Sequence, residues 1–275
     1  MGVLDGKAAI VTGSARGIGR ATAELLAEHG AKVLINDLDG DVANEASKAI
    51  AGDTIAFAGD LTKEGVPDKL VQTAIDSFGQ LDIVVNNAGY TWDAPIHKMS
   101  DEQFQAMLDI HNVVPFKVLR AAAPHLREPA KKEREEGREV FRKVVNVSSV
   151  SGTMGNAGQA NYSSGKSGVV GLTKTVAKEW GQFKINVNAV AFGFVETRLT
   201  AAKEEAGSFD KDGQEIQLGI PEQMRQMASM LIPIGRPATP EEAAGGVFFL
   251  CSPWSNYVHG QVLNVTGGQF TGMTT

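Results

Sequence analysis

The sequence has few of the features that mark secreted, membrane-spanning or nucleic-acid-binding proteins. It contains a single cysteine, Cys251, so no disulfide can form within the chain and a reducing compartment is expected. The first residues lack the basic segment and apolar run of a signal peptide, and no apolar stretch approaches the roughly eighteen residues that cross a bilayer. A formal net charge of −6 disfavours nucleic acid and anionic membranes as partners. We therefore expect a cytoplasmic protein with neither kind of partner.

Short apolar runs alternate with helical patterns along the whole chain. Strands are predicted at 7–12, 32–36, 54–58, 83–85, 143–148, 185–190 and 261–265. Helices are predicted from the end of the glycine turn at 19 to about 29, and at 40–50, 66–78, 101–119, 161–180 and 240–250. This alternation predicts an α/β fold with a doubly wound parallel sheet, Rossmann-like, in three layers and a single domain over residues 1–275. Ligands of such sheets bind at the carboxyl ends of the strands.

Two segments do not follow this alternation. Residues 127–142 form the most charged run, and because both signs alternate we predict a solvated helix or an extended loop. Residues 197–240 shift to Glu, Lys, Gln, Met and Gly without a clear strand, which predicts a lid over the substrate. Cys251 closes the apolar run 247–251, so we expect it to pack in the core rather than to act in redox chemistry.

A glycine-rich turn joins the first predicted strand to the first predicted helix. Its glycines, Gly13, Gly17 and Gly19, follow the pattern Gly-x-x-x-Gly-x-Gly, which differs from the more familiar Gly-x-Gly-x-x-Gly. Strand, glycine turn and helix in this order are what a dinucleotide-binding loop requires, because the backbone amides and the helix N-terminus then face the pyrophosphate. The turn therefore predicts a dinucleotide site.

The second predicted strand ends at Asp37, eighteen residues after Gly19. An acidic side chain at this place accepts hydrogen bonds from the adenosine ribose and repels a 2′-phosphate, so it favours NAD(H) over NADP(H). Two observations keep other interpretations open. Asp37 could instead cap the helix near Asp41, and Arg16 in the glycine turn could bind a 2′-phosphate, so NADP(H) is not excluded.

Polar residues also follow the third and fourth strands. Asp60 is placed for the adenine edge of a cofactor, or else it caps its own loop. The run 86–89 (Asn-Asn-Ala-Gly) lets a cofactor approach the backbone closely, or its asparagines satisfy turn amides. Asn112 lies inside the predicted helix 101–119, where its side chain competes with the backbone. The placement of an asparagine inside a helix has either a packing cause or a functional cause. The neighbouring His111 is predicted to be structural.

Three residues around the fifth strand form a candidate proton-transfer site. Tyr162 and Lys166 are four apart on the helix predicted at 161–180, so they share a face. Ser149 follows the strand predicted at 143–148 and approaches the same place. A free tyrosine titrates near pH 10, and we expect the lysine to lower that pKa. For Tyr162 to act as a base at neutral pH, its surroundings must favour the tyrosinate by roughly 4 kcal/mol. Tyr-x-x-x-Lys by itself also arises by chance.

Together these motifs resemble the short-chain dehydrogenase/reductase family, and the stretch 152–162 is most similar to its 3-oxoacyl-acyl-carrier-protein reductases. The resemblance covers nearly the whole chain. It implies an oxidoreductase that transfers a hydride between NAD(H) and a secondary alcohol or ketone, with 3-oxoacyl and 3-hydroxyacyl thioesters among the candidate substrates. The alternatives are an NADPH-dependent 3-oxoacyl-acyl-carrier-protein reductase and, more remotely, a non-catalytic nucleotide-binding protein.

The resemblance also implies roles for individual residues. Tyr162 would be the general acid/base, Ser149 would position the substrate oxygen, Lys166 would bind the nicotinamide ribose, and Asn112 would hold a water in the proton relay. The implied cofactor-binding set is Gly13, Arg16, Gly17, Ile18, Gly19, Asp37, Asp60, Leu61, Asn87, Ala88, Gly89, Tyr162, Lys166, Val195 and Thr197. The family's habits imply a homotetramer.

The five histidines and the cysteine form no ligand pattern, so we expect no metal. One departure concerns the loop after the sixth strand, where Phe192-Gly193 stands in place of the Pro-Gly of relatives, so this loop is expected to be shaped differently.

Overall fold

A computed structural model describes residues 2–211 and 213–269. Its main sheet has seven parallel strands in the order β3-β2-β1-β4-β5-β6-β9. The strands are β1 Ala8–Val11, β2 Lys32–Asp37, β3 Thr54–Ala58, β4 Ile83–Asn86, β5 Arg142–Ser149, β6 Ile185–Phe192 and β9 Val262–Val265. Every residue of β1, β4 and β6 is buried, which explains why these strands are mostly apolar in sequence. The doubly wound parallel sheet is confirmed.

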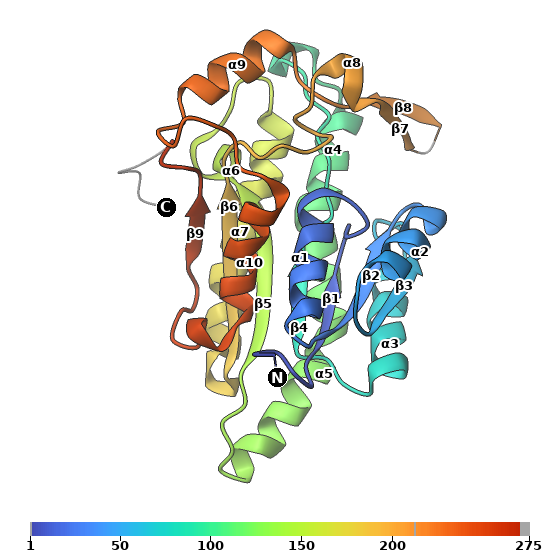
Figure 1. Ribbon diagram of the computed structural model, residues 1–275, viewed down its shortest axis with the longest axis vertical. Helices are drawn as coiled ribbons and strands as arrows, with labels where there is room; N and C mark the ends of the chain where they lie inside the picture. The colour runs from blue at the N-terminus through green and yellow to red at the C-terminus, as the bar shows by residue number, and fades with distance from the viewer. Residues whose placement is uncertain (1, 212, 270–275) are drawn as a thin grey trace.

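Helices cover both faces of this sheet (Figure 1). One core cluster joins the strands to α3 Val66–Phe78, α5 Val114–Glu135 and α7 Ala160–Trp180. The other joins them to α1 Gly17–Glu28, α2 Gly40–Ala49 and α10 Pro240–Cys251. The shorter helices are α4 Asp101–Leu108, α6 Val150–Met154, α8 Lys203–Ala206 and α9 Glu222–Met230. The result is the single three-layer domain that the sequence predicts. Within the described ranges, no helix is long and apolar enough to cross a membrane.

The helix predicted at 101–119 has a different internal structure and a later end. α4 begins with a reciprocal cap, in which the Gln103 amide donates to Ser100 Oγ at 3.1 Å and Ser100 N donates to Gln103 Oε1 at 2.9 Å. A π-helical segment, Asp109–Val113, then carries the chain into α5, which continues to Glu135. A π-helical turn inserts an extra residue and so changes which side chains face the neighbouring helix.

The charged run at 127–142 is only partly solvated, contrary to the prediction. Its first half completes α5, and its last residue, Arg142, begins β5. Arg142 is 5% exposed and donates from Nη1 and Nη2 to the Glu133 carboxylate at 2.7 and 2.9 Å. This hydrogen bond lowers the pKa of Glu133. A buried two-point ion pair therefore joins the end of α5 to the start of β5.

The segment 197–240, predicted to lack strands, contains the antiparallel hairpin β7 Ser208–Lys211 and β8 Gln214–Gln217. The hairpin is anchored to the body of the protein: the Phe209 ring packs edge-on against Tyr90 at 5.0 Å, and Ile216 is 2% exposed within the core. α9 differs, because all of its residues are at least partly exposed. Both parts lie at the end of the molecule where the strands have their carboxyl ends (Figure 1).

Candidate active site

The glycine turn forms a bare backbone cradle between β1 and α1. Gly13 and Gly17 adopt φ values of +59° and +54°, which L side chains rarely adopt. A Cβ on Gly13 would lie 2.7 Å from Ala88 Cα, and a Cβ on Gly19 would collide with the Gly13 carbonyl oxygen. α1 starts at Gly17, and within the described chain no side-chain hydrogen bond comes from its N-cap residue, Arg16. The amides of the first turn therefore remain open to an anionic ligand.

The segment after β4 is tied to this turn. Asn87 donates from Nδ2 to the carbonyl oxygens of Thr12 and Gly13 at 3.0 and 2.9 Å. The amides of Asn87 and Ala88 both donate to Thr12 Oγ1 at 3.0 Å. The asparagine side chain thus satisfies turn carbonyls, and its contribution to the site is to hold the end of β4 against the cradle. At Gly89, a Cβ would strike the imidazole of His111.

Asp37 ends β2 and does not cap α2. Its Oδ1 accepts from the Asp39 amide at 3.2 Å, whereas the cap of α2 is Asp39, which accepts from the amides of Asp41 and Val42. The alternative interpretation of Asp37 as a helix cap is therefore wrong. Arg16 Nη2 lies 3.9 Å from Asp39 Oδ2, so the guanidinium is paired with a carboxylate beside Asp37.

The remaining predicted cofactor contacts lie around the same strand ends. Asp60 caps its own loop, accepting from the amide and hydroxyl of Thr62 at 2.9 and 2.7 Å. The side chain of Leu61 is buried in the core, and Ile18 packs partly buried on the other core cluster. Val195 is buried in a bridge to Ala238. A Cβ on Gly17 would lie 3.6 Å from the Thr197 methyl group, so Thr197 borders the glycine turn.

Phe192, which stands where the family resemblance leads us to expect proline, is the last residue of β6 and packs in the core. The next amide, of Gly193, donates to the Val265 carbonyl oxygen at 3.0 Å. The strand therefore continues to this point instead of turning away before it.

Ser149, Tyr162 and Lys166 meet as the sequence predicts. Ser149 ends β5 and caps α6, accepting from the Ser151 amide at 3.2 Å, and it shares a hydrogen bond with Tyr162. Lys166 Nζ lies 5.7 Å from the centre of the Tyr162 ring and donates to the Val147 carbonyl oxygen at 2.7 Å. The lysine is 4% exposed. A phenol, a hydroxyl and an ammonium are thus gathered at one strand end.

The protonation of this group differs from the expectation. Burial raises the pKa of Tyr162 to about 12, and the hydrogen bond with Ser149 offsets only part of that effect. Burial lowers the pKa of Lys166 to about 7, so its charge is itself weakened at neutral pH. Desolvation by burial is the largest cause of both shifts. It favours the uncharged form of each side chain, which for Tyr162 is the protonated phenol.

The side chains of Asn112 and His111 pack against different parts of α7. A Cβ on Gly168 would lie 2.5 Å from Asn112 Nδ2, so Asn112 packs against α7 beyond Lys166. The His111 ring instead packs edge-on against Tyr162, with ring centres 4.9 Å apart. Sequence spacing predicts which side chains face a neighbouring helix only where the helix is regular. The π-helical turn interrupts that regularity at these two residues.

Comparison with known proteins agrees with this geometry. A family model described as Enoyl-(Acyl carrier protein) reductase matches residues 13–269. A 3-oxoacyl-(acyl-carrier-protein) reductase from Thermotoga maritima is 36% identical over 268 residues, covering 96% of this chain and 98% of the relative. One from Vibrio cholerae is 37% identical over 267 residues, covering 97% and 98%. An uncharacterized oxidoreductase from Mycobacterium bovis is 36% identical over 270 residues, covering 98% of both chains.

The chain belongs to the short-chain dehydrogenase/reductase family. It is an oxidoreductase, and the family implies a nicotinamide cofactor. The residues fit such a group, because the glycine cradle has no room for side chains and the first-turn amides of α1 carry no side-chain cap among the described residues. A carboxylate, Asp37, stands at the end of the next strand, where a ribose would lie.

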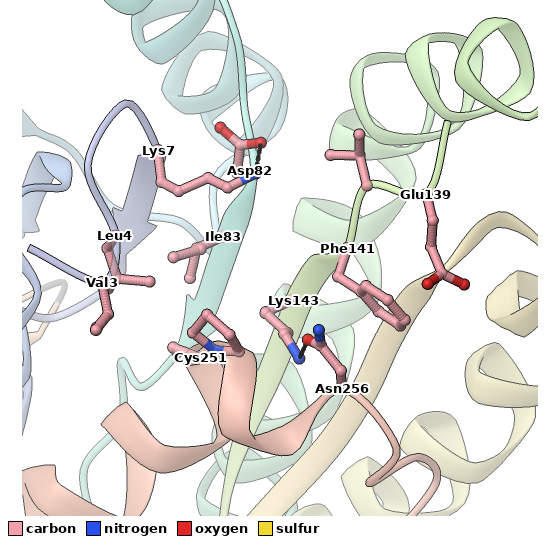
Figure 2. Close-up of a pocket in the computed structure, with 12 residues that line it drawn as sticks. Val3, Leu4, Lys7, Asp82, Ile83, Glu139, Phe141, Lys143, Cys251 and Asn256 are labelled. Carbon is pink, nitrogen blue, oxygen red and sulfur yellow. Dashed lines mark hydrogen bonds and ion pairs between the residues drawn. The ribbon is translucent and has the colours of Figure 1, made fainter. Parts of the chain in front are cut away.

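A cavity of about 240 Å³ lies at the other end of the sheet (Figure 2). Its walls come from the amino ends of β1, β4 and β5, and it contains none of the predicted site residues. Lys143 in its wall donates to Asn186, Ser255 and Asn256 at 2.8, 3.1 and 2.8 Å, so its three protons are used. Cys251, also in the wall, is free and buried, as predicted. These groups hold α10 and the following turn against β5.

Proposed function

We propose that the protein reduces a ketone to a secondary alcohol with NADH, and that 3-oxoacyl thioesters are its substrate class. The observation that carries the proposal is the partly buried Tyr162, whose ring lies 5.7 Å from Lys166 Nζ and whose pKa is raised by desolvation. A phenol that keeps its proton at neutral pH suits the donation of a proton to a carbonyl oxygen, which is the reductive direction. The printed names of the relatives, 3-oxoacyl-(acyl-carrier-protein) reductases, support the substrate class.

When bound, the cofactor would supply the hydride to the carbonyl carbon. Tyr162 would then donate its phenolic proton to the carbonyl oxygen, while the Ser149 hydroxyl donates a hydrogen bond to the same oxygen as charge develops on it. Lys166 would bind the nicotinamide ribose, and its ammonium would stabilise the tyrosinate that remains. We propose that Asn112 holds the water of the proton relay, the role that the family resemblance implies for it.

We propose that the cofactor lies along the carboxyl ends of the strands. Gly13, Gly17 and Gly19 would face the pyrophosphate, Asp37 the adenosine ribose and Asp60 the adenine. The other proposed contacts are Arg16, Ile18, Leu61, Asn87, Ala88, Gly89, Val195 and Thr197. Leu61 and Asn87 would contribute chiefly through their backbone, because the side chain of the first is buried and that of the second is bonded to the glycine turn.

The preference for NADH rests on Asp37 and the Arg16–Asp39 pair. A 2′-phosphate would meet two carboxylates there, and the one nearby guanidinium is already paired with Asp39. Replacing Asp37 with serine is expected to raise the ratio of kcat/KM with NADPH to kcat/KM with NADH by about 10- to 100-fold. The reason is the loss of charge repulsion with the 2′-phosphate, of which about 1.4 kcal/mol corresponds to each factor of ten.

The matched control is Asp41→Ser, which removes an exposed carboxylate from the first turn of α2. It should leave the ratio within about twofold, because screening in water weakens a more distant charge. Steady-state kinetics with both cofactors provide the measurement. A wild-type enzyme that strongly prefers NADPH would contradict this assignment of Asp37.

The reaction itself is tested by oxidation of the reduced nicotinamide with a panel of carbonyl compounds. We expect turnover with acetoacetyl thioesters of coenzyme A or acyl carrier protein, a 3-hydroxyacyl product, and weaker activity with simple ketones. Enoyl thioesters belong in the panel because the matching family model carries an enoyl reductase description. A saturated acyl product from an enoyl thioester would replace the ketone assignment, and cofactor binding without any turnover would favour a non-catalytic role.

We further propose that α9 and its flanking loops, within 197–240, form the substrate lid, supported by the exposure of every residue of α9. We propose a homotetramer in the cytoplasm. The family resemblance supports the assembly, as does the exposed Trp254, whose ring packs on Phe248 of α10. Light scattering should then give about four times the chain mass of 29.1 kDa. A monomer mass at micromolar concentration would contradict the assembly.

A further inference from the structure

Asp93 lies in the loop after β4, and this loop is tied to the start of α7. Three consecutive residues of the loop make hydrogen bonds to the residues just before Tyr162. These bonds join the Trp92 carbonyl oxygen to Asn161 Nδ2 at 2.9 Å, Asp93 Oδ2 to Gln159 Nε2 at 2.8 Å, and the Ala94 amide to the Gly158 carbonyl oxygen at 3.0 Å. The Asp93 carboxylate is therefore fixed beside the helical turn that carries the candidate general acid.

Gln159 also connects Asp93 to the candidate catalytic serine. Its amide oxygen, Oε1, accepts from Ser151 Oγ at 2.9 Å, while its Nε2 donates to Asp93. The Ser151 amide in turn donates to Ser149 Oγ at 3.2 Å. One carboxylate is thus held in a fixed relation to both Ser149 and Tyr162, the two residues between which a carbonyl oxygen would bind.

The negative charge of Asp93 acts on the phenol. Burial is the largest cause of the raised pKa of Tyr162, and the charge of Asp93 adds to it. Asp93 is exposed, yet the surrounding atoms desolvate it enough to raise its own pKa, which the hydrogen bond from Gln159 and the positive charge of Lys203 in α8 oppose. The carboxylate is thus within electrostatic reach of the reacting end of the site and open to a ligand.

The same charge must act on a substrate. A ketone reduced in this site places its oxygen at Tyr162 and Ser149. In a free 3-oxo acid the carboxylate carbon is only two bonds from the ketone carbon, so its charge stays close to the phenol whichever way the substrate turns. A field that reaches the phenol therefore also reaches this carboxylate, and two like charges repel. An ester or a thioester carries no charge at that carbon.

We propose that Asp93 is a specificity-determining residue that disfavours free 3-oxo acids and so selects uncharged 3-oxoacyl esters and thioesters. Selection by repulsion of the wrong substrate needs no contact with the right one. The carboxylate takes no part in the transfer of hydride or proton. The inference deepens the proposed function and rests on it.

The test compares acetoacetate with methyl acetoacetate in the wild type and in Asp93→Asn, at about pH 8, well above the pKa of an ordinary carboxyl. Asparagine has nearly the same shape, and its amide oxygen can still accept from Gln159, so the substitution removes the charge and keeps the hydrogen bond. We expect the ratio of kcat/KM for the ester to kcat/KM for the acid to fall by about 3- to 30-fold. A changed pKa of Tyr162 affects both substrates alike and cancels in this ratio.

Two further variants separate the charge from other effects. Asp101→Asn removes an exposed carboxylate from the first turn of α4, one that does not contribute to the raised pKa of Tyr162, and should leave the ratio within about twofold. Asp93→Ala removes the charge together with the hydrogen bond and should change the ratio as Asp93→Asn does. An unchanged ratio in Asp93→Asn, or an equal change in Asp101→Asn, would overturn the proposal. So would a ratio that changes in Asp93→Ala alone, because the hydrogen bond would then be the cause.

Equilibrium binding tests the charge without any turnover. Calorimetry of the protein with oxidised nicotinamide gives Kd for acetoacetate and for methyl acetoacetate. We expect Asp93→Asn to tighten the binding of acetoacetate by about 3- to 30-fold and to leave the ester within about twofold. An unchanged Kd for acetoacetate, or no binding of either compound, would overturn the inference. The expected change in Kd without turnover of any carbonyl compound would instead overturn the proposed function and leave the role of the Asp93 charge standing.

Discussion

Replacing Tyr162 with phenylalanine is expected to lower kcat for carbonyl reduction by about 10²- to 10⁴-fold, the range for removal of a positioned general acid. The substitution removes the phenolic hydroxyl that lies beside Lys166 and interacts with Ser149. The ring remains, so its edge-on contact with His111 and its packing are retained. Stopped-flow or steady-state oxidation of the reduced nicotinamide with the best carbonyl substrate gives the measurement, and cofactor binding should change little.

The matched control is Tyr257→Phe, because Tyr257 is fully exposed and far along the chain from the site. It should keep wild-type kcat. Full turnover by the Tyr162→Phe enzyme on a verified substrate would show that the proton comes from another group, and the assignment of the catalytic tyrosine would then be wrong.

Replacing Arg142 with methionine is expected to destabilise the fold by about 3–5 kcal/mol, because the Glu133 carboxylate is then left largely buried without its partner. The guanidinium makes two hydrogen bonds to Glu133 and the two side chains are 6% and 12% exposed. The pair joins the end of α5 to the start of the central strand β5. Its loss should therefore lower the free energy of global unfolding. The free energy of unfolding from urea titrations is the measurement.

Arg138→Met provides the control, since Arg138 pairs with Glu136 on the surface, with side chains 56% and 57% exposed. An exposed pair contributes only about 0–1 kcal/mol. Equal small losses in both variants would mean that water screens the Arg142–Glu133 pair as well. Equal large losses would mean that the whole connection between α5 and β5, and not burial of the pair, controls stability.

Most elements of the fold could be predicted because their signals are local. The runs at 54–58 and 66–78 match β3 and α3 residue for residue. A continuous apolar strand reports burial on both faces, and a helical period reports one buried face, so neither depends on distant residues. The hairpin β7–β8 was missed for the opposite reason. Its strands are four residues each, and they are stabilised by Phe209 on Tyr90 and by burial of Ile216, contacts that a local pattern does not contain.

The candidate site divides in the same way. The i, i+4 spacing of Tyr162 and Lys166 and the place of Ser149 after a strand were enough to predict that the three meet. The protonation of the pair was not predictable, because it depends on how far burial removes each group from water. Nor were the different neighbours of His111 and Asn112, since a π-helical turn leaves no period in the sequence.

The sequence alone therefore determined the doubly wound sheet, the glycine cradle with a carboxylate at the next strand end, and the pairing of Tyr162 with Lys166. These follow from apolar period, backbone freedom and helical spacing, which are properties of short stretches. Only the tertiary structure decided that Arg142 pairs with Glu133 away from water, that desolvation raises the pKa of Tyr162 and that His111 lies beside that ring. Desolvation and packing are set by what the rest of the chain places around a residue, so no short stretch contains them.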